Sequence, residues 1–397
     1  MCAARGHPLV LEKGLESMEG ISMASATRVK ESGILDAVRI LAPVVVARSH
    51  EVEQSRRLPP DLVAQLTEAG CFRALVPRSH GGAELALPSQ MQVLEELARA
   101  DGSVGWTVMI GCAAPVLLGL LPRETFDAIY ADGPDVILGG AFNPTGAATP
   151  VDGGFKVSGR WAFASGCQHC HWFLANSIVN DGREPPMRTM VLPPSDVEIV
   201  DTWSVSGLCG TGSHDFVASD VFVPAARTFQ LGGEPCLDVP VLRIPELSLS
   251  TLMLGSVAMG IARAALEDVT TMAAKKVPAF TRGALASNPL FQYQLGEADA
   301  RLRAARGLLF ADAEQVWATA TSGVPFTPEH RARIRATVTW VTKTAASVVD
   351  VAYRAGGGSV IYARSPLQRR FRDIHALTQH FAVKLDTFTQ AGAVLAG

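Results

Sequence analysis

The stretch "VSGRWAFASGCQHCHWFLANSIV", residues 157–179, decides the fold because it holds two strand-like runs joined by a turn. The run "FKVSGRW" alternates apolar and polar side chains, and "HWFLANSIV" is rich in aromatic and β-branched residues, which is typical of strands. The joining segment also spells C-x-x-C-H at residues 167–171, the spacing of a covalent haem attachment site. The same thiols could hold zinc or act as a redox pair, so three chemical interpretations compete with an ordinary turn.

The context of this segment argues against all three interpretations. Haem attachment normally needs export, and residues 1–30 mix charge, Gly and Ser around no apolar core, so we expect no signal peptide. A zinc site needs a second Cys/His pair, and a redox C-x-x-C usually precedes a helix N-terminus, but the sequence offers neither. We therefore predict a turn and no metal. The seven cysteines are odd in number and scattered, which favours a reducing cytoplasm.

Composition and charge narrow the possible partners. The chain has 397 residues, of which 48% are hydrophobic and 18% charged, as in a globular protein of two or three domains. The net charge of −3 gives no electrostatic reason to expect a nucleic acid partner. Residues 102–122 carry no charge and are long enough to span a bilayer, but they contain Pro115 and several glycines. We expect a buried helix there and no membrane, with small molecules and further copies of the chain as partners.

The period of the apolar residues divides the chain into three parts. Residues 31–135 and 236–397 show helical spacing, whereas residues 136–235 consist of short runs between Gly- and Asp-rich turns. Residues 1–30 are expected to be a disordered extension. The predicted fold class is α+β: an N-terminal helical domain, a central β-barrel or sandwich and a C-terminal four-helix bundle. Long helices are predicted over residues 33–58, 87–106, 247–276, 288–323, 327–358 and 367–395.

Three motifs resemble those of the acyl-CoA dehydrogenase superfamily. The stretch "VSGRWAFASG" resembles the family's strand pair containing Trp-Ile-Thr-Asn-Gly, and "SGLCGTGSHDFVASDVFVP" resembles its second strand pair. The stretch "GGGSVIYARSPLQRRFRD" is similar to the family's C-terminal motif, which ends in Arg-Asp. The motifs stand in the family's order, and the resemblance covers about residues 35–385. It implies the family's fold of helices, a central β domain and a helical bundle.

Within this superfamily the closer resemblance is to the two-component flavin-dependent monooxygenases, such as the oxygenase of 4-hydroxyphenylacetate 3-hydroxylase and dibenzothiophene monooxygenase. The segments "FASGCQH", "GTGSHD" and "RDIHALTQH" are similar to that branch. The resemblance implies reduced FMN or FAD supplied by a separate flavin reductase, capture of O₂ as a flavin C4a-hydroperoxide, and transfer of one oxygen atom. The implied substrate is a small aromatic, phenolic or polycyclic molecule. The resemblance also implies a homotetramer packed through its C-terminal helices.

His380 is the main candidate for a catalytic residue. In acyl-CoA dehydrogenases the catalytic Glu lies eight residues beyond the Asp of the Arg-Asp pair, but here Asp373 plus eight is Phe381. The monooxygenase branch places a histidine at plus seven, which is His380. An imidazole there could deprotonate a phenol or hydrogen-bond the peroxide. His375, five residues before His380, is expected to be structural.

The resemblance also implies residues that contact the flavin. The Ser165 hydroxyl is expected to bond flavin N5 or the peroxide, which makes it the second catalytic candidate. Arg282 resembles the family's arginine that pairs with the flavin phosphate, and bidentate phosphate binding suits Arg. Close approach of a partner subunit's cofactor would explain Gly357 and Gly358 at the end of the helix 327–358, and helix capping would too. The expected cofactor-binding residues are Trp161, Phe163, Ala164, Ser165, Thr211, Arg282, Gln292, Gly357 and Gly358.

Trp106, Cys112 and His214 are the candidates for a substrate pocket, although a core position is the alternative for the first two. Two other functions stay open at this point. An acyl-CoA dehydrogenase-like enzyme would need a carboxylate base elsewhere, for example near Glu297. A non-catalytic flavin-binding relative would bind flavin without using oxygen. The sequence does not distinguish FMN from FAD, and it does not name the substrate.

Overall fold

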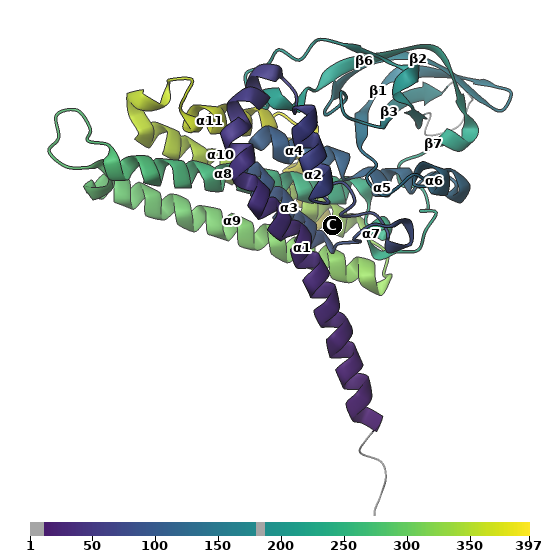
Figure 1. Ribbon diagram of the computed structural model, residues 1–397, viewed down its shortest axis with the longest axis horizontal. Coiled ribbons are helices and arrows are strands. Elements are labelled where there is room, and N and C mark those ends of the chain that lie inside the picture. The colour runs from purple at the N-terminus through teal and green to yellow at the C-terminus, as the bar shows by residue number, and fades with distance from the viewer. Residues whose placement is uncertain (1–11, 180–186) are drawn as a thin grey trace, which may run out of the picture.

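The computed structural model describes residues 12–179 and 187–397, with side chains from residue 33 onward. Figure 1 shows three parts: a sheet at the upper right, long helices that run across the molecule below it, and N-terminal helices packed between them. The order of helices, sheet and helices confirms the predicted fold class. The N-terminal helices are α1 Glu12–Ser55, α2 Pro60–Glu68, α3 Leu87–Ala100, α4 Gly102–Gly111, α5 Ala114–Leu118 and α6 Arg123–Ile129.

Helix α1 begins at Glu12, so residues 12–30 are helical in the structure, within the segment expected to be a disordered extension. This segment is rich in Glu, Met, Ala, Leu and Lys, which have high helix propensity. Residues 1–11 lie outside the described residues. In Figure 1 the first part of α1 extends away from the rest of the chain, and the later part packs beside α3 and α4.

The single helix predicted over residues 87–106 is two helices, because Asp101 starts a new one. Its backbone is extended, and its carboxylate accepts the N–H groups of Ser103 and Val104 at the start of α4. An Asp side chain in this position satisfies N–H groups that have no partner within the helix. The apolar run at residues 102–122 becomes α4 and α5, which are buried almost throughout.

Seven strands form the central domain and lie within the predicted residues 136–235. They make one mixed sheet in the order β5-β6-β2-β1-β3-β4-β7, in which β1 and β3 are parallel and the other pairs antiparallel. Trp161 and Phe216 stack in its core with ring centroids 5.0 Å apart. The strands are β1 Leu138–Val151, β2 Gly154–Ala164, β3 Trp172–Val179, β4 Met187–Leu192, β5 Glu198–Val200, β6 His214–Pro224 and β7 Thr228–Phe229.

The C-terminal part is built around α8 (Glu246–Lys275), which packs against α3, α9 (Pro289–Ser322) and α10 (Pro328–Gly356). Helix α8 is long and apolar enough to cross a membrane, but 89% of its apolar window is buried inside the protein. Small residues such as Gly255 and Gly260 let its neighbours approach closely: a Cβ on Gly260 would lie 2.3 Å from the carbonyl oxygen of Glu95. Helix α8 is therefore the core helix of the bundle. The short helix α7 (Pro240–Arg243) precedes it.

The last helix predicted, over residues 367–395, is interrupted. Helix α11 covers Pro366–Leu377 and α12 covers Asp386–Ala396, with the short 3₁₀ helix η7 (Phe381–Val383) between them. The interruption falls at His380, whose backbone is extended (φ −66°, ψ 140°) and whose ring accepts the Ala382 N–H. The ring thus caps η7 in the way that an Asp or Ser caps other helices.

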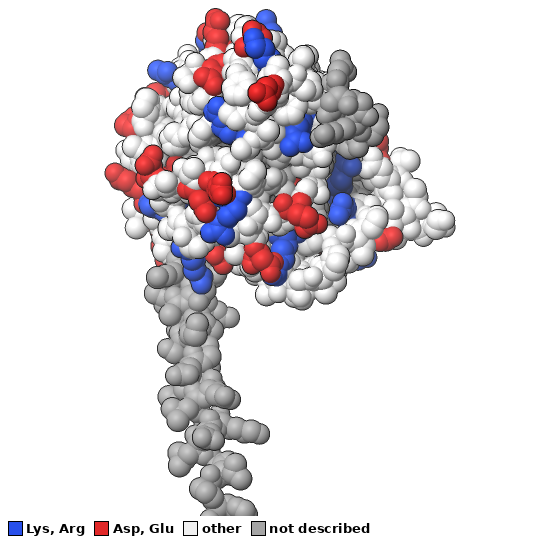
Figure 2. Space-filling view, turned by 90° about the vertical axis from the view of Figure 1, so that its right-hand side faces the viewer, with Lys and Arg blue, Asp and Glu red and all other residues white. Residues whose placement is uncertain are grey.

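Figure 2 shows the face of the molecule at the right-hand side of Figure 1. Lys and Arg side chains are interspersed there with Asp and Glu side chains. Ion pairs at the surface of the protein include Arg56 with Asp201 and Arg160 with Asp215. Such a mixed surface agrees with the small net charge and offers nucleic acid no continuous basic track on this face.

Candidate active site

Trp106, Ser165 and His380 meet at one place although they come from three parts of the chain. Trp106 lies on α4, Ser165 directly follows β2, and His380 lies between α11 and η7. The Trp106 indole N–H donates to the Ser165 hydroxyl over 3.0 Å, and its ring centroid lies 5.3 Å from that of His380 in an edge-to-face arrangement. The two predicted catalytic residues are therefore joined by the tryptophan predicted for the substrate pocket.

A bulge at the end of β2 positions Ser165. Trp161 pairs with Phe216 and Ala164 pairs with His214, so β2 has one more residue than β6 over this interval. Phe163 takes up the extra residue in the left-handed region (φ 68°), and its side chain is 64% exposed. A bulge re-aims side chains relative to simple alternation. It leaves Phe163 outside the sheet, with its ring centroid 6.2 Å from that of Trp203.

The loop before β6 approaches Ser165 from the other side. It contains the 3₁₀ helix η3 (Cys209–Thr211), and the Thr211 carbonyl accepts the Gly166 N–H over 2.8 Å. The Ser213 hydroxyl lies 2.7 Å from both the Ser165 and the Thr211 hydroxyls. Thr211 donates in turn to the Leu208 carbonyl over 2.8 Å. Three hydroxyl groups and one indole N–H thus form a continuous buried chain.

Asp373 of α11 holds the same loop. Its Oδ1 accepts the Leu208 N–H over 2.7 Å, although Leu208 adopts a left-handed conformation (φ 52°). Its Oδ2 is buried without a hydrogen-bond partner among the described residues. Burial and the nearby Asp101 carboxylate raise the pKa of Asp373 above its usual value. The aspartate of the Arg-Asp motif therefore links the C-terminal helices to the loop that carries Thr211 and Ser213.

The His380 ring is neutral at neutral pH, because burial lowers its pKa to about 4. Its Nδ1 accepts the Ala382 N–H over 3.3 Å, so the neutral ring carries its proton on Nε2. In the described part of the chain Nε2 has no hydrogen-bond partner. His380 therefore offers an N–H donor beside Trp106. His375 differs: its Nε2 lies 2.9 Å from Asp350 Oδ1, as expected of a structural histidine.

Trp161 and Ala164 have fully buried side chains in the sheet core. The Trp161 indole donates to the Asn176 carbonyl over 2.7 Å and stacks on Phe216, so its ring surface is not available to a cofactor. The alternation of β2 turns Trp161 inward, whereas the bulge turns Phe163 outward. Of the aromatic residues predicted to line the flavin, Phe163 alone has an exposed ring.

The residues expected at the flavin phosphates lie at another end of the molecule. Arg282 and Gln292 belong to the loop between α8 and α9 and to the start of α9, at the left of Figure 1, whereas the sheet lies at the upper right. Both are exposed, and Gln292 donates to the Ala286 carbonyl. Gly357 and Gly358 are exposed beyond α10, and Lys276 bonds the neighbouring Gly356 carbonyl and Ser359 hydroxyl. A single chain does not bring this group together with Ser165.

Cys112 and His214 occupy core positions. Cys112 is buried and accepts an N–H of Gln90, and burial raises the pKa of its thiol to about 12. The Nδ1 of His214 accepts the backbone N–H groups of Thr202 and Trp203, each over 3.2 Å. Burial lowers the pKa of His214. Of the three substrate-pocket candidates, Trp106 is the one that contacts the predicted catalytic residues.

The C-x-x-C segment forms a turn, as predicted. Cys167 donates to the Gly212 carbonyl and Cys170 to the Cys167 carbonyl, each over 3.3 Å. Burial raises the pKa of both thiols, to about 11 for Cys167, so neither is a ready thiolate. Within residues 12–179 and 187–397 there is no group of three or more His, Cys, Asp and Glu side chains that could hold a metal ion.

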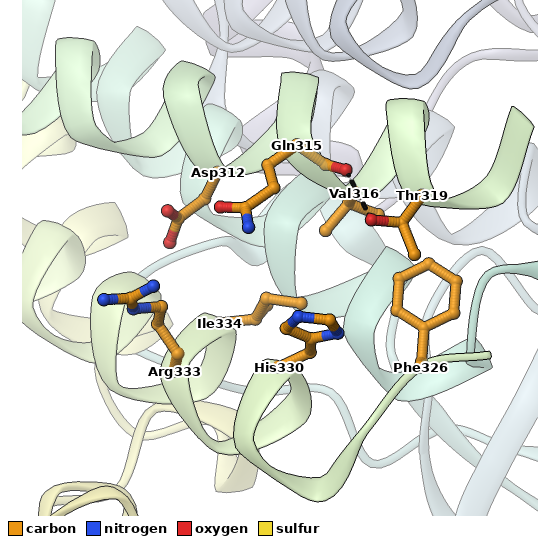
Figure 3. A pocket seen from close by; sticks show the side chains of 8 residues that line it. All are labelled: Asp312, Gln315, Val316, Thr319, Phe326, His330, Arg333 and Ile334. Atoms are coloured by element: carbon orange, nitrogen blue, oxygen red, sulfur yellow. Dashed lines mark hydrogen bonds between the residues drawn. The ribbon is translucent and has the colours of Figure 1, made fainter. Parts of the chain in front are cut away.

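A separate hollow lies between α9 and α10. Figure 3 shows Asp312 and Arg333 pointing toward one another across it, with Phe326 at its other end. His330 lines it, but its ring accepts the Thr327 N–H at the start of α10 and so completes a helix cap. None of the residues predicted from the sequence lines this hollow.

Comparison with known proteins identifies the family. Residues 30–120 match the N-terminal domain and residues 252–385 the C-terminal domain of acyl-CoA dehydrogenase. Indole-3-acetate monooxygenase of Pseudomonas putida is 37% identical over 92% of this chain and 92% of its own. The oxygenase subunit HsaA of a flavin-dependent monooxygenase from Rhodococcus jostii is 31% identical over 86% of this chain and 92% of its own.

A solved structure agrees with these matches: 3-HSA hydroxylase from Rhodococcus superimposes with a TM-score of 0.87 at 29% identity, covering 92% of this chain and 97% of the other. The matches and the observed architecture thus define a chain of the acyl-CoA dehydrogenase fold. In this chain an imidazole, that of His380, lies beside Trp106, which also contacts Ser165. The chain belongs to the flavin-dependent monooxygenases of the acyl-CoA dehydrogenase superfamily, and it is an oxygenase component. Both the predicted superfamily and the predicted branch are confirmed.

Proposed function

We propose that the chain takes a reduced flavin from a separate reductase and uses O₂ to hydroxylate a small aromatic molecule at the site formed by Trp106, Ser165 and His380. The observation that carries this proposal is the contact of one indole with both predicted catalytic residues, at 3.0 Å to the Ser165 hydroxyl and 5.3 Å to the His380 ring. The reaction with O₂ would be carried out by the bound reduced flavin, whereas the protein supplies binding, orientation and electrostatics.

The groups around Ser165 fit an isoalloxazine ring. Phe163 presents an exposed aromatic ring, which can pack against a flat ligand. Ser165 offers a hydroxyl oxygen, and His380 offers the N–H of Nε2. A polar edge and an apolar face are what a tricyclic ligand with ring nitrogens and carbonyl groups requires.

The structure favours hydrogen-bond donation by His380 over proton abstraction. A general base works best with a pKa near the operating pH, whereas burial lowers the pKa of His380 to about 4. If Nε2 of His380 accepted a proton as a base, the ring would have to carry its own proton on Nδ1. That proton would then face the Ala382 N–H, which donates to Nδ1 in the structure. We therefore assign His380 the role of donating from Nε2 to an oxygen atom at the reacting centre.

A carboxylate base of the dehydrogenase type is not supported at this position. Position 381 is Phe381, which is 39% exposed and packs against His380 with ring centroids 4.6 Å apart. Glu297, the alternative considered from the sequence, is paired on the surface of α9 with Arg301 over 2.6 Å. Its pairing and its place on α9 give it no contact with Ser165 or Trp106.

The substrate proposal rests on relatives. One acts on indole-3-acetate, and another, 29% identical over 87% of this chain, is a FADH₂-dependent resorcinol hydroxylase from Rhizobium. We propose a small aromatic substrate, with indole-3-acetate and simple phenols as the first compounds to test. Both FADH₂ and reduced FMN remain to be compared as the flavin.

A homotetramer is proposed for the assembly. Several large apolar side chains on the C-terminal helices are exposed in the single chain, including Leu308, Trp340 and Leu395. These side chains are available for contacts between subunits. A partner subunit would also explain why Arg282 and Gln292 lie away from Ser165.

A cytoplasmic location is proposed as well. It is supported by the unpaired cysteines of the described residues, since a reducing compartment keeps thiols free. These cysteines are Cys71, Cys112, Cys167, Cys170, Cys209 and Cys236.

The proposal is tested by supplying purified protein with chemically reduced FMN or FAD, O₂ and the aromatic compounds above. Hydroxylated product with one O₂ consumed per product is the expected result. A protein that purifies with tightly bound oxidised FAD, which acyl-CoA then reduces, would instead be a dehydrogenase. A protein that binds reduced flavin and converts all O₂ to H₂O₂ with every compound would remove the proposed substrate class.

A further inference from the structure

Four buried polar groups form an unbroken hydrogen-bonded chain beside the proposed flavin site. It runs from Trp106 Nε1 to Ser165 Oγ (3.0 Å), to Ser213 Oγ (2.7 Å) and to Thr211 Oγ1 (2.7 Å). It ends at the Leu208 carbonyl oxygen (2.8 Å). The side chains are no more than 6% exposed, so water does not replace these bonds. Ser213 was not among the residues predicted from the sequence.

The two ends of the chain fix the position of every proton in it. An indole nitrogen only donates and a carbonyl oxygen only accepts, whereas each hydroxyl has one proton. Thr211 gives its proton to the Leu208 carbonyl, so it accepts from Ser213. Ser213 has then used its own proton and accepts from Ser165. All the hydroxyl groups consequently donate away from Trp106.

This direction determines what Ser165 can offer a ligand. Its proton points to Ser213, and one of its lone pairs receives the Trp106 N–H. The second lone pair is what remains for a bound molecule. Ser165 is therefore a hydrogen-bond acceptor toward the site, and a ligand atom that needs a donor could be served only by breaking the chain.

Flavin N5 changes character with oxidation state: it carries a hydrogen in reduced flavin and is a bare acceptor nitrogen in oxidised flavin. We propose that Ser213, through Thr211, is a positioning residue that holds Ser165 as an acceptor, so that the site binds reduced flavin in preference to oxidised flavin. The proposal rests on the proposed function and on the contact of Ser165 with flavin N5 that the family resemblance implies. It assigns the preference to the buried hydroxyl groups of Ser213 and Thr211, which act on the ligand through Ser165.

The test is the ratio of the dissociation constants of oxidised and reduced FMN, measured by anaerobic titration of the full-length protein, and then repeated with FAD. Ser213→Ala leaves the Ser165 proton without its acceptor, so Ser165 can turn and donate to oxidised N5. The ratio is expected to fall about five-fold, the effect of one hydrogen bond. Thr211→Val frees the Ser213 proton to point toward Ser165, and it is expected to lower the ratio in the same direction.

Ser177→Ala is the matched control. Ser177 is a fully buried serine of the same sheet, its hydroxyl donates to the Ala175 carbonyl, and it takes no part in the chain. A general loss of packing would weaken both flavin states in all variants and leave the ratio at the wild-type value, which would overturn the proposal. A wild-type protein that binds neither flavin state would contradict the proposed function itself. If one of the two chain variants fails to fold, the ratio of the other decides.

Discussion

The indole of Trp106 stands edge-to-face against the imidazole of His380, with ring centroids 5.3 Å apart and an interplanar angle of 73°. The same indole donates to Ser165. Trp106 therefore fixes the separation between the histidine and the serine that were both predicted to act on the flavin. The arrangement joins the N-terminal helices, the sheet and the C-terminal helices in one site, so the site exists only when all three parts are folded together.

His380→Ala is expected to abolish most of the hydroxylation and to leave reduced flavin bound. The variant removes the N–H donor next to Trp106, and one positioned hydrogen-bond donor at a reacting centre typically contributes about 10²–10³-fold to rate. Product formation and H₂O₂ release are measured together, with oxygen consumption expected to continue as H₂O₂. His375→Ala on the neighbouring helix α11 is the control and should retain product formation. Unchanged turnover by His380→Ala would remove His380 from the site.

Trp106→Phe is expected to lower the share of consumed O₂ that appears in product by about five-fold, because it deletes one hydrogen bond to Ser165. The ring that faces His380 remains, so the effect reports on the indole N–H. The share is measured from oxygen uptake and product yield. Trp317→Phe, at a partly buried position of α9, should behave as wild type. Equal shares for Trp106→Phe and wild type would exclude a role for the indole N–H.

Phe163→Ala is expected to weaken flavin binding about ten-fold, since it deletes the exposed aromatic ring at the bulge. The midpoint of thermal unfolding should change little, because the ring is 64% exposed. Anaerobic titration with reduced flavin measures the effect. Phe222→Ala, which removes a 48% exposed ring from β6, is the control. A similar loss of affinity in both variants would show that Phe163 has no special place in the site.

Asp373→Asn is expected to remove a contribution that lowers the stability of the folded protein as the pH rises. Burial and Asp101 raise the pKa of Asp373 in the folded protein above its unfolded value of about 3.9. The folded state therefore binds more protons than the unfolded state just above that pH, and the stability this proton contributes is lost as the pH rises. The unfolding midpoint at pH 8 minus that at pH 5 should therefore be more positive in Asp373→Asn than in wild type.

Asp220→Asn, which removes an exposed carboxylate paired with Lys156, should keep the wild-type difference between the two pH values. Asn at position 373 still offers an oxygen to the Leu208 N–H, so flavin binding should survive. Asp373→Ala removes that oxygen and should lower stability at both pH values by about 1–3 kcal/mol. The same pH dependence in Asp373→Asn and wild type would show that this carboxyl is charged in the folded protein.

Much of the fold could be predicted because helical and strand periods differ clearly along the chain. The breaks within helices could not, because they depend on single side chains: Asp101 caps α4, and His380 caps η7 with its own ring. The way in which β2 presents its aromatic residues could not be predicted from alternation either. Trp161 and Phe163 are two apart and should share a face, but a bulge buries the first and exposes the second.

The site itself was predicted in part. The offset from the Arg-Asp motif led to His380, and the strand motif led to Ser165, but Ser213 carries no such signal. Its role depends on a loop that brings it to Ser165 from 48 positions away in the sequence. In the proposed homotetramer Arg282 would act through contacts with a partner subunit, which neither spacing nor periodicity can predict.

Oxygen labelling tests the proposed function most directly. Wild-type protein is given reduced flavin, indole-3-acetate or a phenol, and ¹⁸O₂ in unlabelled water, and the product is analysed by mass spectrometry. One ¹⁸O atom per hydroxylated product is expected, formed only when reduced flavin is supplied, with H₂O₂ in place of product in His380→Ala. Oxygen derived from water in the product, or the same labelled yield from His380→Ala, would contradict a flavin-dependent oxygenation site built from Trp106, Ser165 and His380.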